Sequence, residues 1–368
     1  MSAIVTVLIL ILLSFIAIGI VWVVIQNVLT EGSEDITLNS LTLNLELQKI
    51  VYSPGQIDVA IKRNSGKGEF DGLRFVLFDG KKSEIIDVPG EIPELGTKTF
   101  NVPYDGVTKE LSAAPTLTSG TGEVKLGETQ IKIEYEDDEI IRNIPGIISW
   151  WKLDEDFRDS VGKNHVTEIN NAPEFVAGKI DKAVEFGRGG YPNSTDNDYI
   201  VIAPGEDLQF GGNGLSLFAW VKQDSSTGDK YLFGNTIDWA FFNGPGQYRG
   251  GYGLLIKDNK MHLQAWTEEE SASTVSWEIE NSEIIDTSWH HLGVTFNGSE
   301  ATFFVDGTEG DSYLKSSNLL PSNYSFCLGA LARNPAYFGL NGNLDNVMVF
   351  DRALTNKEIN ALYESPWN

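Results

Sequence analysis

The first 30 residues of the chain contain no charged side chain and consist mainly of Leu, Ile and Val. A helix that is apolar on every side has no face for water, so lipid or other helices must enclose it. The segment also exceeds the roughly 20 residues that cross the apolar core of a bilayer. It therefore predicts a long apolar N-terminal helix over residues 1–30, acting as a filament core or a membrane anchor.

The charges near this segment favour the filament. A secretory signal peptide would begin with basic residues and have a shorter apolar run. A membrane anchor is normally oriented by Lys or Arg beside the span, but the first basic residue here is Lys49, and Glu31, Glu34 and Asp35 follow the run directly. We interpret the missing positive flank as the removal of a basic leader.

The opening residues Ser2-Ala3-Ile4-Val5-Thr6 resemble the start of processed archaeal type IV pilins and archaellins. This resemblance implies that a prepilin peptidase removes a leader and that the helices of many copies bundle together. The chain shows no such leader, and it has no acidic residue near position five, unlike bacterial type IV pilins. The residues expected to pack in the bundle are Ile4, Val7, Ile11, Phe15, Ile18 and Trp22.

Short alternating segments separated by turns follow the apolar run. They are Thr37–Leu45, Ile57–Ile61, Leu73–Phe78 and Gln130–Tyr135. Alternation of apolar and polar residues predicts strands with one buried face. We expect an immunoglobulin-like β-sandwich over residues 31–145, acting as a structural spacer. Pilins of the family above carry such a domain, and Asn143-Ile144-Pro145-Gly146 marks its predicted end.

Residues 146–368 resemble the concanavalin A-like jelly rolls of the laminin G type. The segments that carry this resemblance are Ser149–Glu155, Asp159–His165, Leu215–Lys222, Trp289–Phe296 and Gly342–Leu354. The resemblance implies a two-sheet sandwich, in which Trp220 and Trp289 suit the space between the sheets better than a sugar platform. A capping box at Thr355 and Glu358 predicts one short C-terminal helix. The predicted fold class is thus mostly β, with a long N-terminal helix and two sandwiches.

The resemblance also implies a structural Ca²⁺ ion, bound by the carboxylates of Asp159 and Asp345 and by an oxygen of Asn164. The alternative is that Asp159 caps a turn and Asp345 accepts hydrogen bonds from backbone amides.

A ligand site is predicted in the loop 238–249, where Trp239, Tyr248 and Arg249 could stack on and hydrogen-bond a glycan. The alternatives are a loop folded back on the domain and a contact with a neighbouring subunit. Asn193, Asn297 and Asn323 begin N-glycosylation tripeptides.

The sequence favours no enzymatic activity. His290 and His291 are neighbours on a predicted strand and point to opposite faces, so they do not grip one ion together. No strand carries the spaced carboxylates of jelly-roll glucanases, and no Gly-x-Ser-x-Gly elbow is present. The net charge of −25 excludes nucleic acid as a partner.

These features predict a subunit of an extracellular pilus-like filament that displays its laminin G-like domain for adhesion. Its partners would be copies of itself, a glycan or protein on another cell, and the membrane before assembly. A membrane-anchored lectin-like adhesin that does not polymerise is the alternative, and a surface glycan hydrolase is the weaker one.

Overall fold

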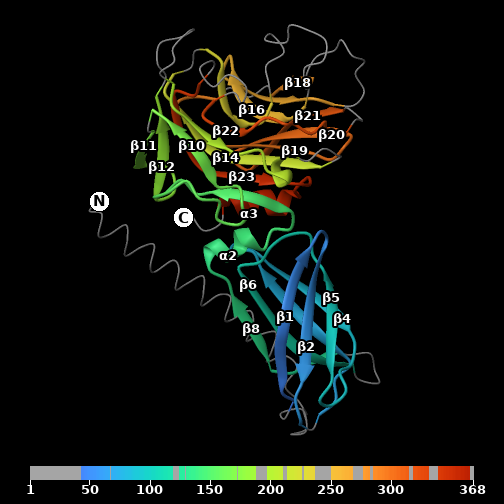
Figure 1. Cartoon of the computed structure of the whole chain (residues 1–368). Helices are drawn as coiled ribbons and strands as arrows, with labels where there is room; N and C mark the ends of the chain where they lie inside the picture. Colours follow the sequence, from blue (N-terminus) through green and yellow to red (C-terminus); the bar gives the residue numbers. More distant parts are fainter. Residues whose placement is uncertain are drawn as a thin grey trace, which may run out of the picture. The chain divides into compact units, whose positions relative to one another are not determined.

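The computed structural model describes residues 43–66, 68–118, 124–128, 130–171, 173–187, 197–209, 214–225, 228–236, 250–267, 277–281, 285–314, 318–330 and 339–364 (Figure 1). The chain divides into two compact units, residues 1–143 and 144–368.

The predicted fold class is wrong in its helical part. The described residues contain two short α-helices, α2 (Asp137–Arg142) and α3 (Asn356–Glu364), and one 3-10 turn, η2 (Glu206–Leu208). No helix among them is long and apolar enough to cross a membrane. The segment 1–30 itself, with the six residues expected in the bundle, lies outside the described residues. An apolar segment can form a stable helix only where lipid or neighbouring helices surround it, and the apolar pattern by itself does not supply those surroundings.

The N-terminal unit consists of two antiparallel sheets around one core. The first has the order β1-β2-β5, and the second has the order β4-β3-β6-β7 with β8 also paired to β6. The strands are β1 (Leu45–Ser53), β2 (Gln56–Arg63), β3 (Gly72–Phe78), β4 (Ser83–Pro89), β5 (Thr97–Pro103), β6 (Glu110–Thr118), β7 (Val124–Leu126) and β8 (Ile131–Glu134). The alternation in the sequence explains the packing, because Ile57, Val59 and Ile61 of β2 are all fully buried. The assignment of the N-terminal unit as an immunoglobulin-like β-sandwich stays a prediction.

The C-terminal unit consists of two larger antiparallel sheets. One has the order β10-β13-β22-β15-β16-β17-β18, and the other has the order β11-β12-β23-β14-β19-β20-β21 with β9 paired to β23 (Figure 1). The first sheet contains β10 (Val166–Asn170), β13 (Tyr199–Ile202), β15 (Lys230–Gly234), β16 (Tyr252–Lys257), β17 (Lys260–Ala265), β18 (Trp277–Glu280) and β22 (Phe326–Leu328). The second contains β9 (Ile147–Trp151), β11 (Glu174–Ala177), β12 (Lys182–Phe186), β14 (Leu215–Gln223), β19 (His290–Phe296), β20 (Glu300–Val305), β21 (Thr308–Leu314) and β23 (Gly342–Phe350).

Both sheets supply side chains to a single core. Leu217 and Val294 enter it from the eight-stranded sheet, and Leu254 and Leu263 enter it from the seven-stranded sheet. Strands distant in sequence lie side by side, since β23 pairs with β9, β12 and β14. The mostly β, two-sheet prediction for this unit is therefore confirmed.

Two tryptophans occupy places other than those predicted. Trp220 is buried, but its ring packs on His291 and on Tyr363 of α3, with ring centroids 5.1 and 5.6 Å away. It therefore lies on the outer face of the eight-stranded sheet, where α3 covers it. Trp289 is only partly buried and is not part of the core between the sheets.

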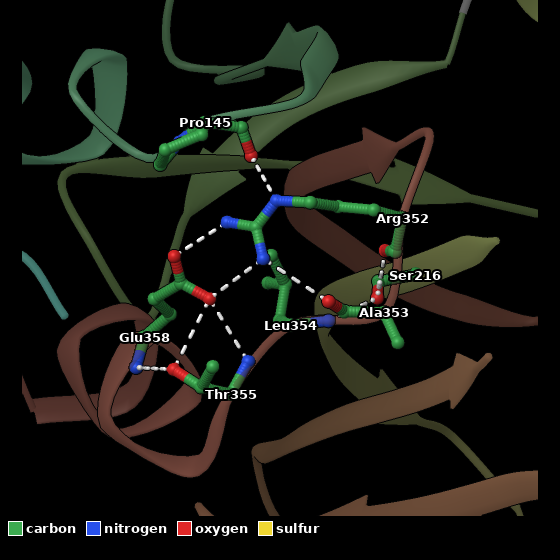
Figure 2. A network of polar contacts seen from close by, with 7 residues as sticks. All are labelled: Pro145, Ser216, Arg352, Ala353, Leu354, Thr355 and Glu358. Atoms are coloured by element: carbon green, nitrogen blue, oxygen red, sulfur yellow. Dashed lines mark hydrogen bonds and ion pairs between the residues drawn. The ribbon is translucent and has the colours of Figure 1, made fainter. Parts of the chain in front are cut away.

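A network of polar contacts holds α3 against the end of β23 (Figure 2). The predicted capping box is confirmed, because Glu358 N donates to Thr355 Oγ1 at 3.3 Å and Thr355 N donates to Glu358 Oε2 at 2.9 Å. Arg352 binds the Glu358 carboxylate and donates from Nε to the carbonyl of Pro145 at 2.8 Å. Ser216 Oγ of β14 donates to the Arg352 carbonyl at 2.7 Å. The chain is thus fixed where it enters the C-terminal unit.

Candidate functional site

Asp159 caps the loop in which it lies. Its Oδ1 accepts hydrogen bonds from the backbone N–H groups of Trp150, Val161 and Gly162 at 3.0, 3.1 and 2.9 Å. Its Oδ2 accepts one from Asn164 N at 3.1 Å. The carboxylate is buried, and four N–H donors surround its two oxygens.

The other two residues predicted to bind Ca²⁺ are also engaged. Asp345 Oδ2 accepts from Ile180 N at 2.9 Å, and its Oδ1 accepts from Asn346 Nδ2 at 2.6 Å. Burial of this carboxyl raises its pKa to about 7, although the hydrogen bonds act in the opposite direction. The Asn164 carbonyl accepts from Trp151 Nε1 at 2.9 Å.

These residues, as placed, do not fit a calcium site. Ca²⁺ takes six to eight oxygen ligands, while here the carboxylate oxygens of Asp159 and Asp345 and the Asn164 carbonyl oxygen accept from N–H groups, whose positive ends a cation would repel. The residues that the structure describes contain no group of three or more His, Cys, Asp or Glu able to hold a metal. The geometry fits the alternative, in which Asp159 caps a turn and Asp345 accepts from backbone amides.

Trp239, Tyr248 and Arg249 lie outside the described residues, but both ends of their loop are described. Asn235 follows β15, donates from N to the Tyr252 carbonyl at 2.9 Å and accepts from Tyr252 N on its Oδ1 at 3.0 Å. Its Nδ2 donates to the Leu208 carbonyl at 2.7 Å. One buried side chain thus ties together η2, β15 and β16 at the point where the loop leaves the sheet.

A second segment, residues 318–324, packs against the same point. Gly251 N donates to the Leu320 carbonyl at 2.8 Å, and Ser322 Oγ donates to the Asn235 carbonyl at 2.7 Å. A Cβ atom added to Gly250 would lie 1.9 Å from the Pro321 carbonyl oxygen, so only glycine fits there. We call Asn235, Gly250, Gly251 and residues 318–324 the loop root. These hydrogen bonds make it a rigid base for the loop.

The outer face of the seven-stranded sheet carries polar side chains that the sequence analysis missed. His262 and Gln264 alternate along β17 with the core residues Met261 and Leu263. Tyr231 donates from its hydroxyl to Gln264 Oε1 at 3.0 Å, and the side chains of Tyr231, His262 and Gln264 are all buried. At the margin, Glu280 of β18 accepts from Lys260 Nζ at 2.9 Å. We call Tyr231, His262, Gln264 and Glu280 the polar face. The alternation Lys260-Met261-His262-Leu263-Gln264-Ala265 was the signal that could have found it.

His290 and His291 have opposite environments and share no ligand. His290 lies between two carboxylates, with Nδ1 2.8 Å from Asp306 Oδ2 and Nε2 3.0 Å from Asp286 Oδ1. Burial lowers its pKa, but the two carboxylates outweigh this effect and the net shift is upward. His291 is fully buried against Phe218 and Trp220, and burial lowers its pKa to about 3. It therefore stays neutral at physiological pH.

The predicted glycosylation sites differ in surroundings. Asn297 is exposed and forms the turn between β19 and β20, and Asn323 is exposed within the segment 318–324. Asn193 lies outside the described residues.

Residues 193–360 match a laminin G family described as the concanavalin A-like lectin/glucanases superfamily. No curated protein matches the chain. Domain 4 of AbnA, a GH43 extracellular arabinanase from Geobacillus stearothermophilus solved with arabinotriose, is 18% identical, with 59% of this chain and 98% of that chain covered and a TM-score of 0.43.

Two further solved structures are similar over about half of their own length. The binding domain of Paraclostridial Mosquitocidal Protein 1 is 17% identical, with 61% of this chain and 53% of that chain covered and a TM-score of 0.45. The sialidase of Trypanosoma rangeli, solved with sialic acid, is 15% identical, with 87% and 53% covered and a TM-score of 0.40.

Proposed function

Because the C-terminal unit contains a laminin G-like jelly roll, we propose that this protein is a binding protein that recognises a glycan through the end of its seven-stranded sheet. The loop root carries this proposal. Binding residues are often placed on loops that a rigid scaffold positions, and Asn235 together with residues 318–324 provides such a scaffold.

The sequence of the rooted loop supports a glycan as the ligand class. It contains Trp239 and Tyr248, whose rings suit the apolar faces of sugars, and Arg249, which donates several hydrogen bonds. A protein on another surface is the second ligand class.

We propose binding rather than hydrolysis. A glycosidase needs a carboxylic acid with a raised pKa beside a second carboxylate. In the described polar face the carboxylate is Glu280, and the hydrogen bond from Lys260 lowers its pKa. Asp345 has a raised pKa, but it is buried in the other sheet.

The proposal is limited to binding. Display on a filament was expected from the apolar residues 1–30, the charges that follow them and the resemblance of a helix followed by a sandwich to pilins, and none of the described residues supports it.

The test is binding of the full chain to an array of glycans, followed by calorimetric titration of the best ligand. We expect Trp239→Ala and Tyr248→Ala to abolish binding. Phe175→Ala is the matched control, because Phe175 is an exposed aromatic residue on β11, an edge strand of the other sheet. We expect it to bind normally, and we expect the bound glycan to be recovered uncleaved.

Three outcomes would contradict the proposal: no glycan retained by the full chain, equal loss of binding in all three variants, or cleavage of the bound glycan. If the full chain instead bound a protein, and Trp239→Ala abolished that binding, the ligand would be a protein and not a glycan.

A further inference from the structure

The turn between β19 and β20 holds the side chain of Asn297 in a fixed orientation. Asn297 Oδ1 accepts three hydrogen bonds, from Ser299 N at 3.0 Å, Ser299 Oγ at 2.8 Å and Glu300 N at 2.9 Å. The Asn297 N–H donates to the Glu300 carbonyl at 3.1 Å, which closes the turn. The side-chain amide is therefore oriented and polarised from one side.

The next residue supplies an accessible nucleophile. Gly298 has a φ of +89° and carries no side chain that would shield its main-chain nitrogen. Its N–H donates to no acceptor among the described residues. The Gly298 nitrogen and the Asn297 amide carbon can close a five-membered ring, and holding the amide in place lowers the entropy cost of closure.

We propose that Asn297 is a site of spontaneous deamidation, at which the main-chain nitrogen of Gly298 displaces the side-chain ammonia. The Gly298 nitrogen loses its proton to solvent and bonds to Cγ of Asn297, and the negative charge passes to Oδ1. Three donors already bond to Oδ1 in the folded chain, so they are in place to stabilise the negative charge that develops on this oxygen.

The reaction is completed by water. The Cγ–Nδ2 bond breaks, and Nδ2 takes up a proton and leaves as ammonia, which gives a cyclic imide. Water then opens the imide at either carbonyl and yields aspartate or isoaspartate. The net change is an amide plus water converted to a carboxylic acid plus ammonia, so no other reactant is needed.

A second Asn-Gly pair in the same chain has a different backbone environment. Gly342 is the first residue of β23 and pairs with both Phe186 and Gln223, so neighbouring strands hold its backbone. A Cβ atom there would lie 2.2 Å from the Lys222 carbonyl oxygen, so the neighbouring strand passes close to this backbone. Asn341-Gly342 is therefore a matched control with the same chemistry in a different backbone.

The product at position 297 has two consequences. An aspartate keeps an oxygen acceptor for the same three donors, with a full negative charge that strengthens the hydrogen bonds. Deamidation also prevents N-glycosylation of the Asn297-Gly298-Ser299 tripeptide, because the side-chain amide nitrogen is lost.

The test is storage of the folded full chain in mildly alkaline buffer, with peptide mapping by mass spectrometry over time. We expect the conversion of Asn297 to aspartate and isoaspartate while Asn341 stays intact. In the urea-unfolded chain we expect both to convert. Gly298→Ala should strongly slow conversion at 297, because its methyl group shields the main-chain nitrogen. Ser299→Ala should also slow it, and Ser299→Thr should restore the hydroxyl donor and the wild-type rate.

Conversion of Asn341 as fast as Asn297 in the folded chain would overturn the proposal, and so would an intact Asn297 after the unfolded chain has converted. An unchanged rate in Ser299→Ala would overturn the role of the oxyanion donors. Asn297→Asp checks the product separately, since it should fold with an unchanged or higher melting temperature.

Discussion

Arg352 holds the buried carboxylate of Glu358 with both of its terminal nitrogens, and Nη1 lies 2.9 Å from Oε2. The same guanidinium reaches Pro145 through Nε. A pair six residues apart in the sequence therefore joins the start of the C-terminal unit to its last helix (Figure 2).

Arg352→Ala is expected to destabilise the C-terminal unit by about 3 kcal/mol, because it leaves a buried carboxylate without its partner. Arg74→Ala is the control. Arg74 also pairs with a carboxylate, Asp87 at 2.7 Å, but that pair is exposed and contributes at most about 1 kcal/mol. Urea unfolding of both variants measures the difference, and equal losses would contradict this account.

Gly250→Ala is expected to disrupt the loop root and to weaken glycan binding, because its Cβ would overlap the Pro321 carbonyl. Gly55→Ala is the control, since Gly55 also has a positive φ, +81°, but no heavy atom lies within 4 Å of its added Cβ. In Gly55→Ala the expected cost is therefore limited to backbone strain of about 1–2 kcal/mol. Melting temperature and ligand affinity should both fall in Gly250→Ala, whereas Gly55→Ala should keep the wild-type affinity.

The two adjacent histidines should make stability depend on pH in opposite directions. The pKa of His290 is raised, so its contribution is present below the unfolded value of about 6.5 and is lost as pH rises through the folded value. The pKa of His291 is lowered to about 3, so its imidazole stays neutral in the folded state at pH values where it binds a proton in the unfolded state. Its effect is a loss of stability as pH falls below about 6.5.

NMR titration of the imidazole rings tests this directly, with His290 expected to titrate above 6.5 and His291 to remain neutral down to about 3. The carboxyl of Asp345, with its pKa raised to about 7, acts in the same direction as His290. Unfolding of His290→Asn across the pH range isolates the histidine, and a pH profile identical to that of the wild type would refute its role.

Ca²⁺ is expected to leave the melting temperature unchanged, because N–H donors already surround the Asp159 carboxylate. Asp159→Ala should cost about 2–3 kcal/mol, since buried donors lose their acceptor. Asp79→Ala is the control. Asp79 also accepts two backbone N–H bonds, from Lys81 and Lys82, but in an exposed turn where water can replace it. If Ca²⁺ raised the melting temperature of the wild type but not that of Asp159→Ala, Asp159 would be a calcium ligand and this prediction would be wrong.

The local features of this protein could be predicted from its sequence. The alternation in β2 predicts which side chains are buried, and Thr355 with Glu358 predicts the start of α3. Both depend on residues within a few positions of each other, so short-range sequence carries them. The polar face could have been predicted in the same way, because His262 and Gln264 alternate with core residues along one strand.

What the sequence could not decide is what covers each face and what each carboxylate meets. Trp220 is buried by Tyr363, a residue of the last helix. Asp159 accepts from Trp150 on β9, and Asp345 accepts from Ile180 in a different loop. Strand periodicity, turns, the helix cap and the local N–H bonds to Asp159 from Val161, Gly162 and Asn164 all follow from spacing along the chain. The bonds from Trp150 to Asp159 and from Ile180 to Asp345 depend on the tertiary structure, because those partners come together only when distant strands pair.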